Sequence, residues 1–136
     1  MPRYFVDTFY LVALSDPRDQ WHARVLAFSR SLSDYHLYTV DEVLAEYLTF
    51  YSASRLHVRE DAVRTIRNVL HDPKITVIPQ SHASFLDALA FYASRLDKHY
   101  SLTDCVSMQA MRHEGLTDVL TNDHHFTQEG LHILFP

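Results

Sequence analysis

The chain has 136 residues and a formal net charge of −5, and this length is typical of one domain with a sizeable hydrophobic core. Its single cysteine, Cys105, excludes an internal disulfide framework and leaves no second thiol for a zinc site. No uncharged apolar run reaches membrane-spanning length, and the N-terminus lacks the apolar stretch of a signal peptide. We therefore expect one domain over residues 1–136, located in the cytoplasm and without a membrane contact.

Short β-like runs alternate along the chain with longer segments of helical periodicity. The predicted strands occupy residues 3–7, 36–39, 75–78, 117–121 and 132–135. Apolar residues recur at helical spacing in three of the intervening segments, within residues 40–51, 62–70 and 85–96. Such alternation is typical of βαβ units, so we predict an α/β fold with a mostly parallel central sheet of four to five strands flanked by helices.

The apolar helix faces have two interpretations. Wide faces rich in Tyr, Phe and Leu are usually core, but they can also form the surface of a dimer. Between residues 40 and 70, apolar side chains that include Tyr47, Phe50 and Tyr51 exceed what one small sheet needs. We expect this region to expose aromatic side chains.

Four acidic residues far apart in the sequence fall near predicted strand ends or helix starts: Asp7, Glu46, Asp104 and Asp123. Ligands of open α/β proteins bind at the carboxyl ends of the strands, where the fold would bring these side chains together. Carboxylates at contact distance raise one another's pKa unless a cation lies between them. A hard, oxygen-seeking cation such as Mg²⁺ or Mn²⁺ is the natural partner.

Three of these acids also have a purely structural interpretation. Asp7 could cap a helix that starts at Thr8, and Asp123 could form a turn. Asp104 fits the last position of a capping box that begins at Ser101 and opens a helix ending at Gly115. The four acids are the ones that the topology would bring together. If they formed no site, a separate structural explanation would have to hold for each of them.

Glu46 has a competitor, Glu42, one helical turn earlier. At about 100° per residue, Glu42 points away from the apolar stripe of its helix, whereas Glu46 lies nearer the edge of that stripe. We therefore expect Glu42 to be solvated and Glu46 to face a cleft. Charged residues on a helix usually form its wet face, so helical phase alone gives only a weak preference.

The sequence lacks the residue patterns that other kinds of catalytic site require. The ten histidines include no pair at i,i+3 or i,i+4, as a helical zinc site of the H-E-x-x-H type requires. Neither G-x-x-x-x-G-K-[ST] nor G-x-G-x-x-G occurs. Cys105 is better explained as helix core than as a nucleophile. A phosphatase of the haloacid-dehalogenase type would need a second aspartate where Phe9 stands.

The segments around the four acids resemble the motifs of PIN-domain ribonucleases, most closely those of VapC-type toxins. They are Phe5–Thr8, Thr39–Glu46, Ser101–Cys105 and Leu120–Phe126, in the family's order and spacing over essentially the whole chain. The resemblance implies a three-layer PIN-like fold. It also implies that the metal-binding, catalytic residues for Mg²⁺ or Mn²⁺ are Asp7, Glu46, Asp104 and Asp123, supported by the hydroxyls of Thr8 and Thr103.

The function implied by the resemblance is a divalent-metal-dependent endoribonuclease that hydrolyses RNA phosphodiester bonds. Such a protein would be the toxin of a toxin–antitoxin pair, a homodimer restrained by a small antitoxin protein. Lys98, just ahead of the Asp104 helix, is the expected substrate-binding residue. The acidic net charge suits RNA poorly, but once four acids are neutralised by a cation, 13 acidic residues face 12 basic ones. The alternative function is a catalytically silent module of the same fold that binds RNA or protein.

Overall fold

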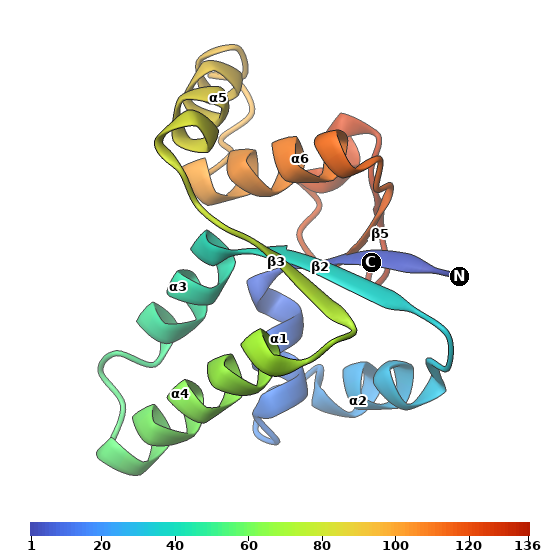
Figure 1. The fold of residues 1–136 in the computed structure, drawn as a ribbon, viewed down its shortest axis with the longest axis vertical. Coiled ribbons are helices and arrows are strands. Elements are labelled where there is room, and N and C mark those ends of the chain that lie inside the picture. Colours follow the sequence, from blue (N-terminus) through green and yellow to red (C-terminus); the bar gives the residue numbers. More distant parts are fainter.

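Five parallel strands form the central layer of the protein in a computed structural model that describes residues Met1–Pro136 (Figure 1). The strand order is β3-β2-β1-β4-β5. Their bounds are β1 (Arg3–Val6), β2 (His36–Val40), β3 (Ile75–Ile78), β4 (Asp118–Leu120) and β5 (His132–Ile133). Each predicted strand is present within about two residues of its expected bounds, and the sheet is wholly rather than mostly parallel.

β1 lies in the middle of the sheet. Phe5 pairs with Tyr38 of β2 on one side and with Val119 of β4 on the other. Parallel sheets are normally covered on both faces, because the connections between their strands cross over as helices. Phe5, Val119 and Leu120 accordingly have no exposed surface.

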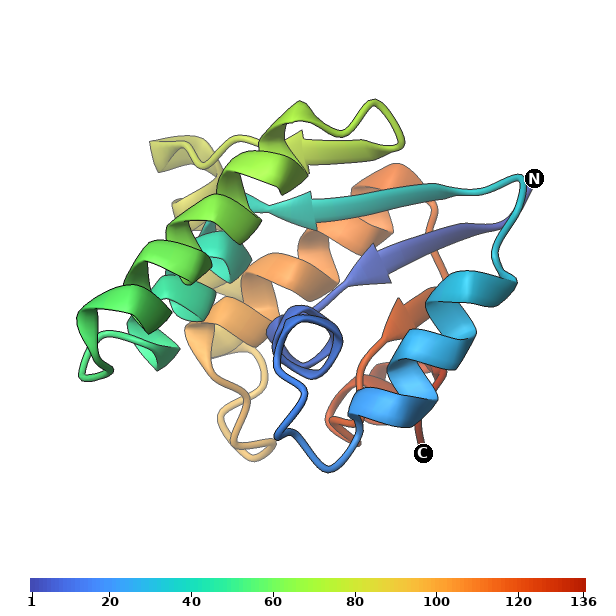
Figure 2. The same ribbon diagram turned by 90° about the horizontal axis from the view of Figure 1, so that it is seen from below.

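Six α-helices form the two outer layers. They are α1 (Thr8–Ser15), α2 (His22–Ser31), α3 (Asp41–Phe50), α4 (Leu56–His71), α5 (His82–Ala93) and α6 (Leu102–Glu114). α5 and α6 lie on one side of the sheet, and α1, α2 and α4 lie on the other (Figures 1 and 2). α3 continues from β2 and contacts α1, α4 and α6. This is the predicted three-layer α/β arrangement, and no helix is both long and apolar enough to cross a bilayer.

The start and the end of α6 follow the predicted local signals. The Asp104 N–H donates to Ser101 Oγ at 3.0 Å, and the Ser101 N–H donates back to Asp104 Oδ2 at 3.1 Å. The helix ends at Gly115, whose φ of 68° lies in the left-handed region that favours glycine. The capping box therefore fixes Asp104 in the first turn of α6.

Two of the three aromatic residues at the end of α3, Tyr47 and Tyr51, are more buried than the sequence predicts. Tyr47 and Tyr51 are only 1% and 6% exposed. The Tyr47 hydroxyl forms a 2.7 Å hydrogen bond with Ser15, and the Tyr51 hydroxyl donates to Asp16 at 3.3 Å. Their i,i+4 spacing places both rings on the inner side of α3, where Ser15 at the end of α1 and Asp16 just after it supply partners for the hydroxyls. The expected exposure is wrong for these two residues and holds for Phe50.

The third apolar stripe stays largely exposed, because α5 packs on α6 rather than on the sheet (Figure 1). α5 buries Ala88 and Phe91. Its outer side chains are between 40% and 48% exposed. We call this set the α5 apolar face: Phe85, Leu86, Leu89 and Tyr92. Of the two interpretations of this stripe, the exposure favours an interaction surface over core.

Candidate active site at the carboxyl ends of β1 and β4

The strand order reverses at β1. The chain adds β2 and β3 on one side of β1 and then returns to place β4 on the other side. In open α/β sheets, such a switch point leaves a crevice beyond the carboxyl ends of the two central strands. Asp7 directly follows β1, and Asp123 follows β4 after a short loop. α3 and the start of α6 bring Glu46 and Asp104 to the same end.

All four predicted acids line one open pocket of about 410 Å³. Its other lining residues are Thr8, Phe9, His99, Ser101, Thr121, Asn122 and His125. Phe9 is the one hydrophobic residue among them, and no Lys or Arg is present. Pockets for small organic molecules are mainly apolar, so this one is suited instead to ions and to charged groups that bind through ions.

Asp7 is the most buried of the four acids, with 8% of its surface exposed. Its Oδ2 accepts a 2.8 Å hydrogen bond from the Thr121 hydroxyl. Burial raises the pKa of Asp7 to about 7, and the charges of Asp104 and Glu46 add to the rise, while the Thr121 hydrogen bond opposes it. Although Asp7 occupies the N-cap position of α1, its side chain makes no capping hydrogen bond. The structure therefore does not support the capping interpretation of Asp7.

Thr121 connects Asp7 to Asp123. Its fully buried hydroxyl donates to Asp7 and accepts the Asp123 N–H at 3.1 Å. Asp123 Oδ1 in turn accepts the His125 N–H at 2.9 Å, which is the turn predicted from the sequence. The turn and the pocket are thus one feature, because Asp123 serves both.

Asp104, Asp123 and His125 form the tightest group in the pocket. One ligand atom from each lies within 4.8 Å of the others. His125 Nδ1 is 3.4 Å from Asp104 Oδ2 and 3.4 Å from Asp123 Oδ1. Burial raises the pKa of Asp104, and the neighbouring charge of Asp123 also raises it, while the Ser101 N–H and His125 partly oppose the rise. A cation between these side chains would relieve both effects.

Glu46 reaches the same pocket from α3, where it accepts a hydrogen bond from the Thr8 hydroxyl. Glu42 lies outside it, in a small cavity that α3, α5 and α6 help to line. Its side chain is half-buried, and its Oε1 is buried without a hydrogen-bond partner. The expected solvation of Glu42 is therefore wrong, whereas the predicted separation of the two glutamates by helical phase is observed.

Two other residues singled out from the sequence lie outside the pocket lining. Thr103 is half-buried in the first turn of α6, and its hydroxyl has no hydrogen-bond partner in the fold. Lys98 forms a 3.5 Å ion pair with Asp97, and the next residue, His99, lines the pocket instead. His99 has a φ of 59°, an uncommon backbone conformation for a residue other than glycine.

Sequence reasoning overlooked several residues of the pocket: His99, Thr121, Asn122 and His125. Three of them belong to the segment Thr121–His125 that contains Asp123, and His99 follows Lys98. Closeness in the sequence to a predicted site residue was therefore the one signal that could have identified them.

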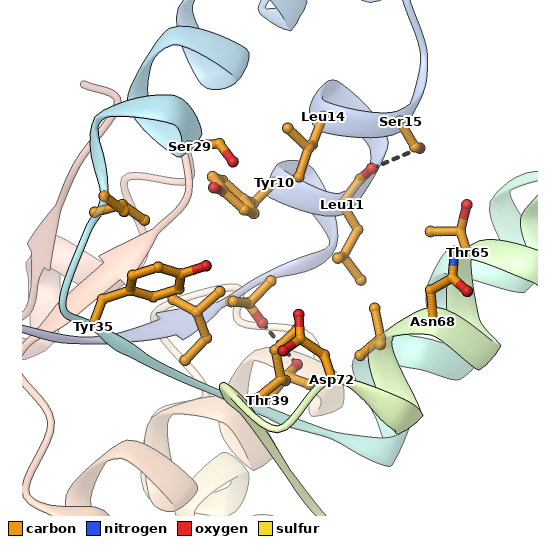
Figure 3. A pocket seen from close by; sticks show the side chains of 15 residues that line it. Tyr10, Leu11, Leu14, Ser15, Ser29, Tyr35, Thr39, Thr65, Asn68 and Asp72 are labelled. Carbon is orange, nitrogen blue, oxygen red and sulfur yellow. Dashed lines mark hydrogen bonds between the residues drawn. The ribbon is translucent and has the colours of Figure 1, made fainter.

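A second cavity, of about 240 Å³, lies between α1, α2 and α4, apart from the acidic pocket (Figure 3). Nine of its 15 lining residues are hydrophobic, among them Leu11 and Leu14, and its one charged residue is Asp72. Tyr10 and Tyr35 also border it (Figure 3). Without clustered acids this cavity is no second metal centre, and it suits an apolar group.

The family model of the PIN domain matches residues 4–129 of the chain. Among solved structures, the chain is similar to VapC20 from Mycobacterium tuberculosis, a sarcin–ricin loop cleaving toxin. The TM-score is 0.82 and the identity 22%, over 94% of this chain and 95% of that one. No protein of curated function matches the sequence.

Two further solved structures share the architecture. FitAcB from Neisseria gonorrhoeae has a TM-score of 0.64 and 17% identity, over 98% of this chain and 96% of that one. VapBC2 from Rickettsia felis, bound to a DNA fragment from its promoter, has a TM-score of 0.66 and 15% identity, over 96% of each chain. At such identities, these structures establish a common fold.

Proposed function

Because the chain belongs to the PIN-domain family, we propose that it is a divalent-metal-dependent endoribonuclease that hydrolyses RNA phosphodiester bonds. The meeting of Asp7, Glu46, Asp104 and Asp123 in one polar pocket carries this proposal. Burial raises the pKa of two of these acids, so keeping them charged costs stability in the absence of a cation. A module that only binds RNA or protein would gain nothing from a cluster of acids that lowers its stability.

The donor atoms of the pocket fit a divalent cation. Four carboxylates supply the hard oxygen ligands that Mg²⁺ and Mn²⁺ take. A partly buried, closely spaced set of acids is stabilised when such an ion neutralises it. When bound, the ion lowers the pKa of a water molecule and stabilises the charge that develops on the phosphodiester oxygens.

The residues of the chain position this chemistry. Thr121 orients the Asp7 carboxylate and favours its ionised form by donating a hydrogen bond. The Thr8 hydroxyl orients Glu46, and the capping box holds Asp104. The pocket offers no thiol, because Cys105 is buried and burial raises the pKa of its thiol to about 11. The Thr8 and Thr121 hydroxyls in the pocket already donate to Glu46 and Asp7, so water is the proposed nucleophile. Lys98, beside His99 at the pocket, is the proposed contact to the substrate.

We further propose that the protein is a cytoplasmic toxin restrained by a small antitoxin protein. The structures named VapBC2 and FitAcB share its fold. The cavity between α1, α2 and α4 is left open by the chain itself, and it would accept an apolar side chain of such a partner. The α5 apolar face offers a separate surface for a second copy of the chain, so the homodimer is proposed to form there.

Cleavage of RNA by the purified protein tests the proposed activity. RNA should be cut in the presence of Mg²⁺ or Mn²⁺ and left intact when a chelator is added. Asp7→Asn should remove most of the activity, and Asp118→Asn, on β4 outside the pocket, should keep it. Cleavage that continues in chelator would contradict the metal mechanism. RNA binding without cleavage would favour the silent module.

A further inference from the structure

His125 is held in a defined orientation beside Asp123. It directly precedes the 3₁₀ turn η1 (Phe126–Glu129), and its backbone N–H donates to the Asp123 carboxylate. Its ring packs edge-on against Tyr100, with 5.4 Å between ring centroids. The Tyr100 hydroxyl donates to Glu129 at 2.7 Å, and Glu129 pairs with Arg95 at 3.0 Å. This chain of contacts restricts the rotation of the imidazole.

The Nδ1 atom of His125 is buried and makes no hydrogen bond of good geometry, although it lies within ion-pair distance of two carboxylates. Buried polar atoms are nearly always partnered in folded proteins, so an exception needs an explanation. This atom lies 3.4 Å from one oxygen of Asp104 and 3.4 Å from one oxygen of Asp123. Two neighbouring ligand atoms bound at about 2.1 Å to one metal are about 3 Å apart in an octahedral site and about 3.4 Å apart in a tetrahedral one. The observed spacing is close enough for the three side chains to share an ion, and it is equally that of an ion pair between the imidazole and the two carboxylates.

We propose that His125 is itself a metal ligand, through Nδ1, together with Asp104 and Asp123. The inference rests on the proposed metal-dependent function and specifies its metal. Imidazole nitrogen is a ligand for transition metals, whereas Mg²⁺ takes oxygen. A centre with this nitrogen prefers Mn²⁺ over Mg²⁺ more strongly than four carboxylates alone would.

The competing role for His125 is that of a positively charged counter-ion between two acids. In that role the imidazolium neutralises Asp104 and Asp123 and competes with any metal for them. The two roles predict opposite outcomes when the ring nitrogens are removed. Loss of a ligand weakens metal binding, whereas loss of a competing charge leaves it unchanged or strengthens it.

Two measurements on the full chain separate these roles. His125→Phe keeps a ring against Tyr100 without nitrogen atoms, and His124→Phe alters the exposed neighbour as a matched control. Mn²⁺ and Mg²⁺ are titrated calorimetrically, and electron spin-echo modulation is recorded on the Mn²⁺-loaded proteins. Wild type and His124→Phe should show ¹⁴N modulation from a bound imidazole. His125→Phe should lose it and bind Mn²⁺ at least about tenfold more weakly, with a smaller loss for Mg²⁺.

His125→Asn provides a second variant, because its shorter side chain puts an amide oxygen near the position of Nδ1. It should also lose the imidazole modulation while keeping most of the Mg²⁺ affinity, since an amide oxygen is a hard ligand. Circular dichroism shows that each variant is folded. Mn²⁺ bound to wild type without ¹⁴N modulation, or bound as tightly by His125→Phe, overturns the inference and leaves the proposed nuclease intact. Failure of wild type to bind Mn²⁺ at all overturns both.

Discussion

The hydroxyl of Thr121 donates a 2.8 Å hydrogen bond to Asp7, a residue 114 positions earlier in the chain. The same oxygen accepts the N–H of Asp123 at 3.1 Å. One buried hydroxyl therefore sets the positions of two acids that come from neighbouring strands. It also favours the ionised form of Asp7, which is the form that the proposed metal site requires.

Replacing this hydroxyl tests its importance. Thr121→Val has nearly the same shape but leaves the Asp7 carboxylate and the Asp123 N–H without their partner. We expect a loss of about 1–3 kcal/mol in the free energy of unfolding and a further rise in the pKa of Asp7. Mn²⁺ binding, measured by calorimetry, should weaken as a result.

Thr39→Val is the matched control for this substitution. Thr39 is equally buried and donates a 2.9 Å hydrogen bond to the Val6 carbonyl, outside the acidic pocket. It should lower stability by a similar amount without changing Mn²⁺ affinity. Equal losses of affinity in the two variants would show that Thr121 acts only through the stability of the fold.

The raised pKa of Asp7 predicts a specific pH dependence for the metal-free protein. Burial raises this pKa from 3.8 to about 7, so in that window the folded state keeps a proton that the unfolded state has lost. The contribution of Asp7 to stability therefore falls as pH rises from about 4 to about 7, and it stays low above that. Asp7→Asn should be more stable than wild type at pH 8, by roughly 4 kcal/mol at most.

Denaturant unfolding of both proteins between pH 5 and pH 8, with chelator present, measures this effect. The stability difference between Asp7→Asn and wild type should widen with increasing pH. Parallel curves would show that Asp7 titrates at its ordinary pKa in the folded protein. The asparagine can still accept the Thr121 hydrogen bond, so that contact does not confound the comparison.

Metal binding should stabilise the fold through Asp123. An ion that binds only the folded state adds about 2.7 kcal/mol at a hundred times its Kd, which raises the melting temperature by several degrees. Asp123→Asn keeps the turn, because its amide oxygen can accept the His125 N–H, but it loses a ligand charge. Without metal it should melt above wild type, since repulsion in the pocket is relieved, and with Mn²⁺ it should gain less. Identical metal-induced shifts would mean that Asp123 is a turn residue and no ligand.

Cleavage rates should distinguish the two glutamates of α3. Glu46→Gln weakens the acid set of the pocket and should reduce cleavage strongly, whereas Glu42→Gln should leave the rate nearly unchanged. Because Glu42 has a buried, unpartnered oxygen, its replacement by a neutral amide should maintain or raise the stability. Equal losses of cleavage in the two variants would contradict the assignment of Glu46.

The oligomeric state tests the α5 apolar face. Light scattering should give twice the 15.9 kDa chain mass for wild type and the single-chain mass for Leu89→Glu. Leu56→Glu, at a 74% exposed position at the start of α4, should remain a dimer. Loss of the dimer in Leu56→Glu alone would move the interface to the region of α3 and α4.

The elements and the two ends of α6 could be predicted from the sequence because their causes are local. A strand needs a short apolar run between turn residues, and a capping box needs only Ser101 and Asp104 three positions apart. Gly115 ends its helix because the last residue takes a left-handed backbone conformation, which glycine adopts without strain. The meeting of Asp7 and Asp123 also followed from chain order, since parallel strands bring their carboxyl ends to one edge of the sheet, whereas Glu46 and Asp104 reach this edge from α3 and α6.

Only the tertiary structure decided which side chains meet. The burial of Tyr47 and Tyr51 depends on hydroxyl partners in and just after α1, and the exposure of the α5 apolar face depends on α5 packing mainly against α6. The roles of Thr121 and His125 depend on contacts to Asp7 and Asp104, residues from other strands and helices. Periodicity reports which face of an element is apolar, but hydrogen bonds and burial depend on what the rest of the fold places opposite that face.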